Sequence, residues 1–195
     1  MLTMCLAALC ACCVGIMALA PAVASAADAP LRVLIIASET HELLELAAKE
    51  VRRYAYATTA TFPTIVHSRD GILAEGAAAA STVVLSTARD AQQLMGSSEE
   101  GEEGDRLRAV SASVLVGGPD AHACERLNSG ATLLLGASPL SVLYAAYEYA
   151  ATDLGVYFAI DGDRIPRRSA RAALPSIARP SASSQPRFGS RGAVP

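Results

Sequence analysis

Acidic side chains are the first candidates for chemistry in this chain, because two carboxyl groups flanking a sugar bond suffice to hydrolyse it. Asp161 and Asp163 follow an apolar segment and flank a glycine. Turn formation accounts for both, since Asp and Gly favour tight turns. Glu39 and Glu42 lie where we expect a helix to begin. The positive end of the helix stabilises the charged form of both carboxylates, so neither is suited to act as a general acid. The sequence therefore identifies no catalytic residue.

The histidines and cysteines are the next candidates, because they ligate metals and act in nucleophilic catalysis. His41, His67 and His122 are scattered over different expected elements. His122 and Cys124 form an H-x-C pair, but the C-x-x-C partner and the adjacent acid of the zinc deaminases are absent. We expect an incidental pair in a loop. No G-x-S-x-G motif occurs, and no Ser/His/Asp arrangement follows from the spacing.

Glycine-rich and acid-rich segments could bind phosphate or calcium. Glycines follow apolar segments in 114–119 and 133–136, but neither segment completes a nucleotide-binding motif, and Pro119 removes one backbone donor. The acidic segment 97–105 does not have the spacing of an EF-hand loop, so we expect a solvated surface loop. The sequence therefore predicts no metal and no cofactor.

Composition and charge limit the partners and the compartment. The 195 residues carry a formal net charge of −3 with no basic stripe, so nucleic acid is not an expected partner. Residues 1–20 contain no Lys, Arg, Asp or Glu, and small residues follow. This pattern predicts a signal peptide over 1–26, with cleavage after Ala26 and export. The alternative is an uncleaved membrane anchor. Cleavage leaves Cys124 as the one cysteine, which excludes an internal disulfide.

Hydrophobic periodicity indicates the elements that must position any site. Residues 43–54 have the spacing of an amphipathic helix, which Ser38 would cap, and residues 140–153 form a second such helix. A short helix is expected over 90–95. Strands are expected at 31–37, 62–67, 82–86, 110–116, 131–135 and 156–160. This order predicts an α+β fold of the α/β sandwich type, with a mixed β-sheet covered by two main amphipathic helices. The domain spans 31–166, and residues 167–184 read as a linker.

Segments at three places along the chain together resemble a known family. The first comprises Leu46-Ala-Ala-Lys-Glu-Val-Arg-Arg-Tyr54, with Thr58 and the strands that follow it. The second is Leu133-Leu-Leu-Gly-Ala-Ser-Pro-Leu-Ser-Val-Leu-Tyr-Ala-Ala-Tyr-Glu-Tyr149 with Leu154-Gly-Val-Tyr-Phe158, and the third is Gln185-Pro-Arg-Phe-Gly-Ser-Arg-Gly192. The chain is similar to the non-catalytic N-terminal domain of α-glucuronidases and bacterial-type β-N-acetylhexosaminidases. It departs from them at Ala145, where the family usually has Gly, and in its acidic segment.

The resemblance implies an accessory domain of a secreted glycoside hydrolase, with residues 185–195 opening a (β/α)₈ catalytic barrel. That barrel is the implied partner, and a carbohydrate substrate would be reached through it. The family's catalytic acids lie on later barrel strands, so this chain alone is expected to be inactive. The family's sugar-contacting arginine corresponds to Arg191, the one substrate-binding residue that the resemblance implies. Two alternatives stay open: a free-standing carbohydrate-binding or interaction module, and a small nucleotide- or metal-binding α/β protein.

Overall fold

The computed structural model describes residues 31–69, 82–94, 101–166 and 183–184. The expected signal peptide, nearly all of the expected linker, and the segment 185–195 with Arg191 lie outside these residues. No helix in the described ranges is long and apolar enough to cross a membrane.

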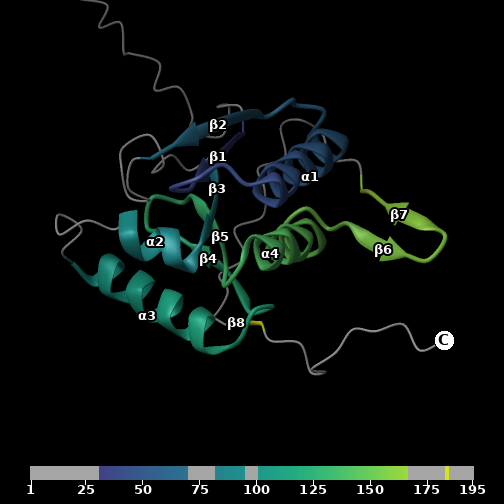
Figure 1. Cartoon of the computed structure of the whole chain (residues 1–195). Coiled ribbons are helices and arrows are strands. Elements are labelled where there is room, and N and C mark those ends of the chain that lie inside the picture. The colour runs from purple at the N-terminus through teal and green to yellow at the C-terminus, as the bar shows by residue number, and fades with distance from the viewer. Residues whose placement is uncertain (1–30, 70–81, 95–100, 167–182, 185–195) are drawn as a thin grey trace, which may run out of the picture.

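A single mixed sheet forms the centre of the molecule (Figure 1). Strands β1 (Arg32–Ile36), β2 (Thr64–Ser68), β3 (Thr82–Thr87) and β5 (Thr132–Gly136) run parallel, in the order β2-β1-β3-β5. Strand β4 (His122–Arg126) pairs antiparallel with β5, and the two-residue strand β8 (Ser183–Ser184) pairs antiparallel with β4. The structure therefore confirms the predicted mixed sheet and α/β sandwich.

The central strands are apolar on both faces, as parallel strands covered by helices on both sides usually are. Leu34, Val84 and Leu133 are aligned across β1, β3 and β5 and lie in the core on one face of the sheet. The next residue of each strand lies in the core on the opposite face. Two hydrophobic cores therefore share one sheet.

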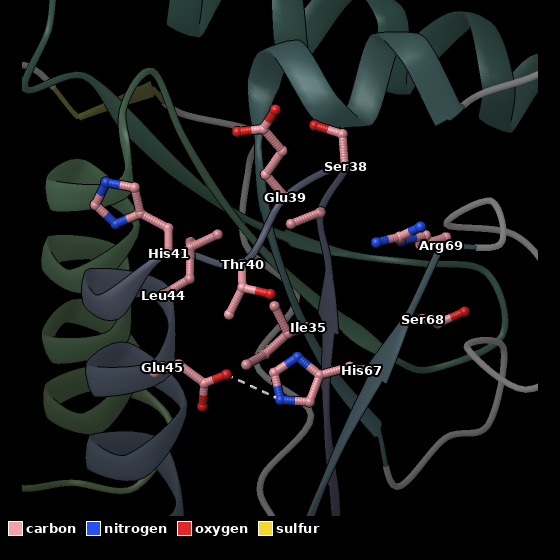
Figure 2. A pocket seen from close by; sticks show the side chains of 11 residues that line it. Ile35, Ser38, Glu39, Thr40, His41, Leu44, Glu45, His67, Ser68 and Arg69 are labelled. Carbon is pink, nitrogen blue, oxygen red and sulfur yellow. Dashed lines mark ion pairs between the residues drawn. The ribbon is translucent and has the colours of Figure 1, made fainter.

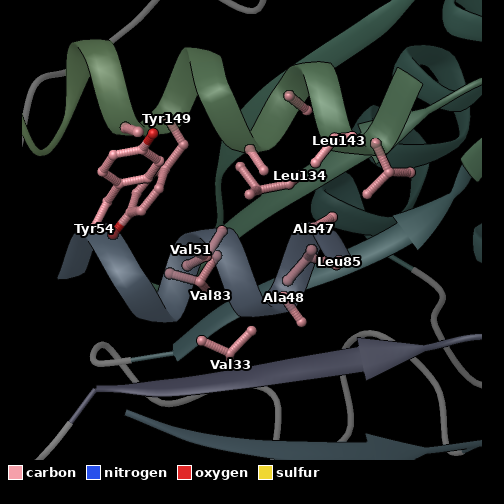
Figure 3. Close-up of a cluster of buried hydrophobic side chains, with 14 of the residues drawn as sticks. Val33, Ala47, Ala48, Val51, Tyr54, Val83, Leu85, Leu134, Leu143 and Tyr149 are labelled. Atoms are coloured by element: carbon pink, nitrogen blue, oxygen red, sulfur yellow. The ribbon is translucent and has the colours of Figure 1, made fainter. Parts of the chain in front are cut away.

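Helices α1 (Glu42–Thr59) and α4 (Pro139–Thr152), the two main helices predicted to cover the sheet, lie side by side on one face (Figure 3). Their core contains Val51 and Tyr54 of α1 and Tyr149 of α4, all nearly inaccessible to solvent. Helix α4 begins with Ser138, whose hydroxyl accepts from the amide of Ser141 at 3.2 Å. The expectation that Ser38 caps α1 is wrong, because His41, three residues further along, caps the helix, which begins at Glu42.

Helices α2 (Ala88–Leu94) and α3 (Glu102–Val116) cover the other face of the sheet. The strand predicted over 110–116 is wrong, because this segment belongs to α3. The surface loop predicted over 97–105 is wrong from Glu102 onward, where α3 begins, and residues 97–100 lie outside the described residues. Leu107, Ser111 and Val114 are buried at helical spacing. Glu102, Glu103 and Asp105 occupy the first turn of the helix, where negative charge is favourable.

A small hairpin stands apart from the main sheet. Strands β6 (Tyr157–Ala159) and β7 (Gly162–Arg164) pair only with each other among the described residues, and Figure 1 shows them projecting beyond the end of α4. The predicted strand 156–160 is thus shorter than expected and forms no part of the main sheet. Asp163, assigned to a turn from the sequence, lies in β7.

Candidate functional site

A cavity lies at the carboxyl ends of β1 and β2, beside the start of α1 (Figure 2). Open parallel sheets generally bind ligands at this edge. The cavity has a volume of about 230 Å³. We call it the carboxyl-edge cavity, and it is lined by Ile35, Ala37, Ser38, Glu39, Thr40, His41, Leu44, Glu45, His67, Ser68 and Arg69.

His41 fixes the point at which the loop after β1 becomes a helix. Its backbone is extended, and its ring nitrogen Nδ1 accepts from the amide of Leu43 at 3.2 Å. Its carbonyl accepts from the amides of Leu44 and Glu45 at 3.0 and 3.1 Å. The ring thus takes the place of the short polar side chain that usually caps a helix. The three residues before His41 form a loop along the cavity.

Asp90 ties this loop to the start of α2. One oxygen of its carboxylate accepts from the amide and hydroxyl of Ser38, and the other accepts from the hydroxyl of Thr87 at 2.7 Å. Burial alone would raise the pKa of Asp90, but the hydrogen bonds from Ser38 and Thr87 outweigh it and hold the pKa below its ordinary value. The carboxyl ends of β1 and β3, where the order of the strands reverses, are therefore bridged by protein groups.

Glu45 of α1 and His67 of β2 form an ion pair in the cavity, with 2.9 Å between Oε1 and Nε2. A carboxylate oxygen only accepts, so Nε2 carries the proton of this hydrogen bond. The other ring nitrogen, Nδ1, points away from Glu45 and toward the side chain of Ile35, which lines the cavity (Figure 2). Glu45 therefore orients the imidazole of His67 and leaves Nδ1 facing the cavity.

Arg69 contributes a positive charge to the same cavity. It follows the end of β2 and is exposed. Among the residues that the structure describes, none accepts a hydrogen bond from its guanidinium or pairs with it. The carboxyl-edge cavity thus combines an oriented imidazole, a guanidinium, hydroxyl groups and an apolar floor.

A second polar cluster fastens the hairpin β6–β7 to α1. The hydroxyl of Tyr54 donates to Oδ2 of Asp163 at 2.7 Å, and Arg53 donates to the same oxygen at 2.9 Å. Burial and the bond to Asp163 raise the pKa of Tyr54. Phe158 packs edge-on against Tyr54 and Tyr147, with ring centroids 5.6 and 5.5 Å apart. This cluster is a structural clamp, because its polar atoms bond to one another.

His122 and Cys124 lie on strand β4, so the expected loop pair is wrong. Nε2 of His122 lies 3.1 Å from Oε2 of Glu148 on α4, and Nδ1 lies 3.0 Å from the carbonyl of Asp120. The thiol of Cys124 faces the carbonyl of Ala145 at 3.5 Å. Within the described ranges, no three His, Cys, Asp or Glu residues come together as a metal site.

The structure separates some candidate residues and joins others. His41 and His67 line the same cavity, together with Glu39, whereas His122 lies elsewhere. Asp161 pairs with Arg164 at 3.8 Å, whereas Asp163 belongs to the clamp. Sequence reasoning missed Glu45 and Arg69 as site residues. The available signal was the position of Arg69 beside the end of an expected strand and of Glu45 in the first turns of the helix that follows another, since parallel pairing brings both places to one edge.

The glycine-containing turns do not form phosphate sites. Gly117 ends helix α3 instead of following a strand. Gly136 packs against the start of α4, where a Cβ atom would lie 2.4 Å from the amide nitrogen of Val142. The helix backbone therefore occupies the space that a phosphate would need.

The chain was compared with known proteins. No protein-family model matches it, and no curated protein matches it significantly.

Proposed function

We propose that the chain is the non-catalytic N-terminal accessory domain of an exported glycoside hydrolase, and that it packs against the catalytic barrel through the hairpin β6–β7. The proposal combines the sequence resemblance with one structural observation. The hairpin is held firmly on the domain and presents apolar side chains to solvent. Such surfaces commonly mark contacts between domains.

The exposed face of the hairpin carries this proposal. Tyr157 is 64% exposed and Ile160 is fully exposed, although both are large and apolar. Phe158, between them in the chain, turns inward to Tyr54 and Tyr147, and this contact fixes the orientation of the hairpin. Because the surface is preorganised, docking a neighbouring domain costs little conformational entropy.

Residues of the second family-like segment act in packing, which suits a structural role. Leu143, Leu154 and Val156 are buried in the core of α1 and α4. Tyr147 and Phe158 form the junction between α4 and the hairpin. Gly155 has φ 73°, a left-handed conformation that favours glycine where the chain leaves α4. The resemblance therefore falls on residues that shape the hairpin and its support.

The first test asks whether the purified chain hydrolyses glycosides. We expect no turnover of chromogenic glucuronides or N-acetylhexosaminides, because the proposal places the catalytic acids in the barrel. Turnover that copurifies with the chain and disappears in Glu45→Gln would overturn the non-catalytic role. Reading the genomic frame beyond the codon for Pro195 provides a second test. A barrel with paired acids is expected there, and a different domain contradicts the proposal.

The docking surface is tested with that barrel produced as a separate polypeptide. The full chain should bind it, and the double variant Tyr157→Ser/Ile160→Ser should bind at least about tenfold more weakly, because buried apolar anchors dominate such interfaces. Tyr56→Ser, an exposed tyrosine on α1, is the matched control and should bind like the unmodified chain. Equal loss in both variants contradicts docking through the hairpin.

Export is a separate part of the proposal. Residues 1–26 are proposed to be a signal peptide that is removed after Ala26. Expression in a host with a secretory pathway, followed by N-terminal sequencing, should give a chain that starts at Ala27. A chain that retains Met1 and stays with the membrane would show an uncleaved anchor instead.

A further inference from the structure

We propose that the carboxyl-edge cavity binds a small hydroxycarboxylate, whose carboxylate pairs with Arg69 and whose hydroxyl bonds to Nδ1 of His67. This inference rests on the cavity alone and does not depend on the proposed accessory role. It assigns a ligand class to a site in which side chains from three elements meet: the loop after β1, helix α1, and the end of β2.

The guanidinium of Arg69 favours a ligand that carries a negatively charged group. Glu45 is hydrogen-bonded to His67, whereas the guanidinium of Arg69 has no partner among the described residues. A guanidinium presents paired donors that match the two oxygens of a carboxylate. Glu39 also lines the cavity and would repel a second negative charge on the ligand. A monocarboxylate therefore fits better than a dianion such as a phosphate monoester.

The imidazole of His67 supplies the hydroxyl specificity. Glu45 accepts from Nε2, so Nδ1 is left for a ligand hydroxyl, which donates to it when the ring is neutral and accepts from it when the ring is charged. A carboxylate that accepts a hydrogen bond from one ring nitrogen in this way fixes the orientation of the imidazole.

The size and the floor of the cavity limit the ligand further. Pockets that bury drug-sized molecules have volumes of about 300–1,000 Å³, and this cavity has about 230 Å³. Ile35 and Leu44 contribute apolar surface to the lining, against which a short carbon chain can pack. The ligand is thus a few carbons long, with its polar groups directed toward β2.

Binding is tested on the full-length chain with glycerate as the probe, and with glycerol and propionate as its two matched controls. Glycerol lacks the carboxylate, and propionate lacks the hydroxyls. The chain has three histidines, so selective labelling of histidine gives few ring signals, which can be followed by NMR during titration. We expect glycerate to shift the His67 signal saturably. Each control should bind at least about tenfold more weakly, because each loses one hydrogen-bonded group.

Two variants locate the site. Arg69→Gln should weaken glycerate binding at least about tenfold and remove the preference for glycerate over glycerol, because it removes the charged partner. Arg164→Gln, an exposed arginine on the hairpin, should bind glycerate like the unmodified chain. Both positions are exposed, so both variants should fold. The proposal is overturned if glycerate gives no saturable shift, if glycerol or propionate binds equally well, or if Arg69→Gln has no effect.

Discussion

Single polar side chains fix the loops at the carboxyl edge of the sheet. Asp90 is the clearest example, because it accepts hydrogen bonds from Ser38 and Thr87, which follow or end different strands. Its position on α2 joins the second helical layer to the loop that borders the carboxyl-edge cavity. A substitution at Asp90 therefore alters the cavity through its bond to Ser38, without replacing any residue that lines the cavity.

Asp90 should make the stability of the domain sensitive to acid. The pKa of Asp90 is lowered in the folded state. Its ionised carboxylate therefore adds to the free energy of unfolding at pH values above its unfolded pKa of about 3.9, and this stabilisation is lost as the pH falls through the folded pKa. Asp90→Asn should lower the urea midpoint at neutral pH and reduce the loss of stability on acidification. Urea unfolding at several pH values between about 2 and 6 checks this. A variant with the parental acid profile would contradict it.

Gly136 should tolerate no side chain, since β5 ends directly against α4. An added Cβ atom would lie 2.4 Å from the amide nitrogen of Val142, which is backbone and cannot rotate away. We expect Gly136→Ala to lower the free energy of unfolding by about 1–3 kcal/mol, the usual cost of overpacking. Urea denaturation measures the change, and unchanged stability would mean that α4 can shift from the sheet.

The candidate site was only partly predictable at the residue scale. His41 and His67 were recognised as candidates, but their spacing does not reveal that they line one cavity. Glu45 and His67 meet because β2 pairs parallel with β1 while α1 packs beside both strands. Hydrophobic periodicity in the sequence indicates which segments are helices or strands, but it does not indicate the order in which the strands pair. The site therefore became visible only with the pairing of the sheet.

At the scale of elements, the sequence predicted the helices and strands correctly where their buried residues are apolar and regularly spaced. The central strands and helices α1 and α4 were predictable because their apolar positions repeat with the period of the element. Helix α3 was missed because its exposed surface includes Leu115 and Val116, which blur the helical pattern into an alternating one. Strand β4 was missed because it contains His122, Glu125 and Arg126, polar residues that pair with neighbours at the sheet edge.

The hairpin β6–β7 should depend on the hydroxyl of Tyr54. Tyr54→Phe keeps the aromatic contact with Phe158 but removes the hydrogen bond to Asp163. We expect a loss of about 1 kcal/mol and faster hydrogen exchange in the hairpin than in the main sheet. Tyr56→Phe, on an exposed tyrosine of the same helix, is the control. If both variants exchange alike, the clamp does not hold the hairpin.

At the scale of the whole molecule, two cores lie on opposite faces of one sheet. Adjacent residues of β5 pack into different cores: Leu134 lies in the core of α1 and α4, and Leu135 lies in the core of α2 and α3. Both side chains are fully buried. Because the same strands support both cores, neither helical layer has a sheet of its own, and loss of one core removes the support of the other.

The two faces should therefore unfold together. Leu134→Ala and Leu135→Ala should each lower the free energy of unfolding by about 2–5 kcal/mol, the usual cost of a cavity in a packed core. Each variant should still show one transition, with an unchanged dependence on denaturant, when followed by circular dichroism and by tyrosine fluorescence. The two signals separate if α2 and α3 can melt alone. In that case Leu135→Ala would unfold in two steps, whereas Leu134→Ala would unfold in one. The domain would then consist of a stable part formed by α1, α4 and the sheet, with a less stable helical layer packed on the other face of the sheet.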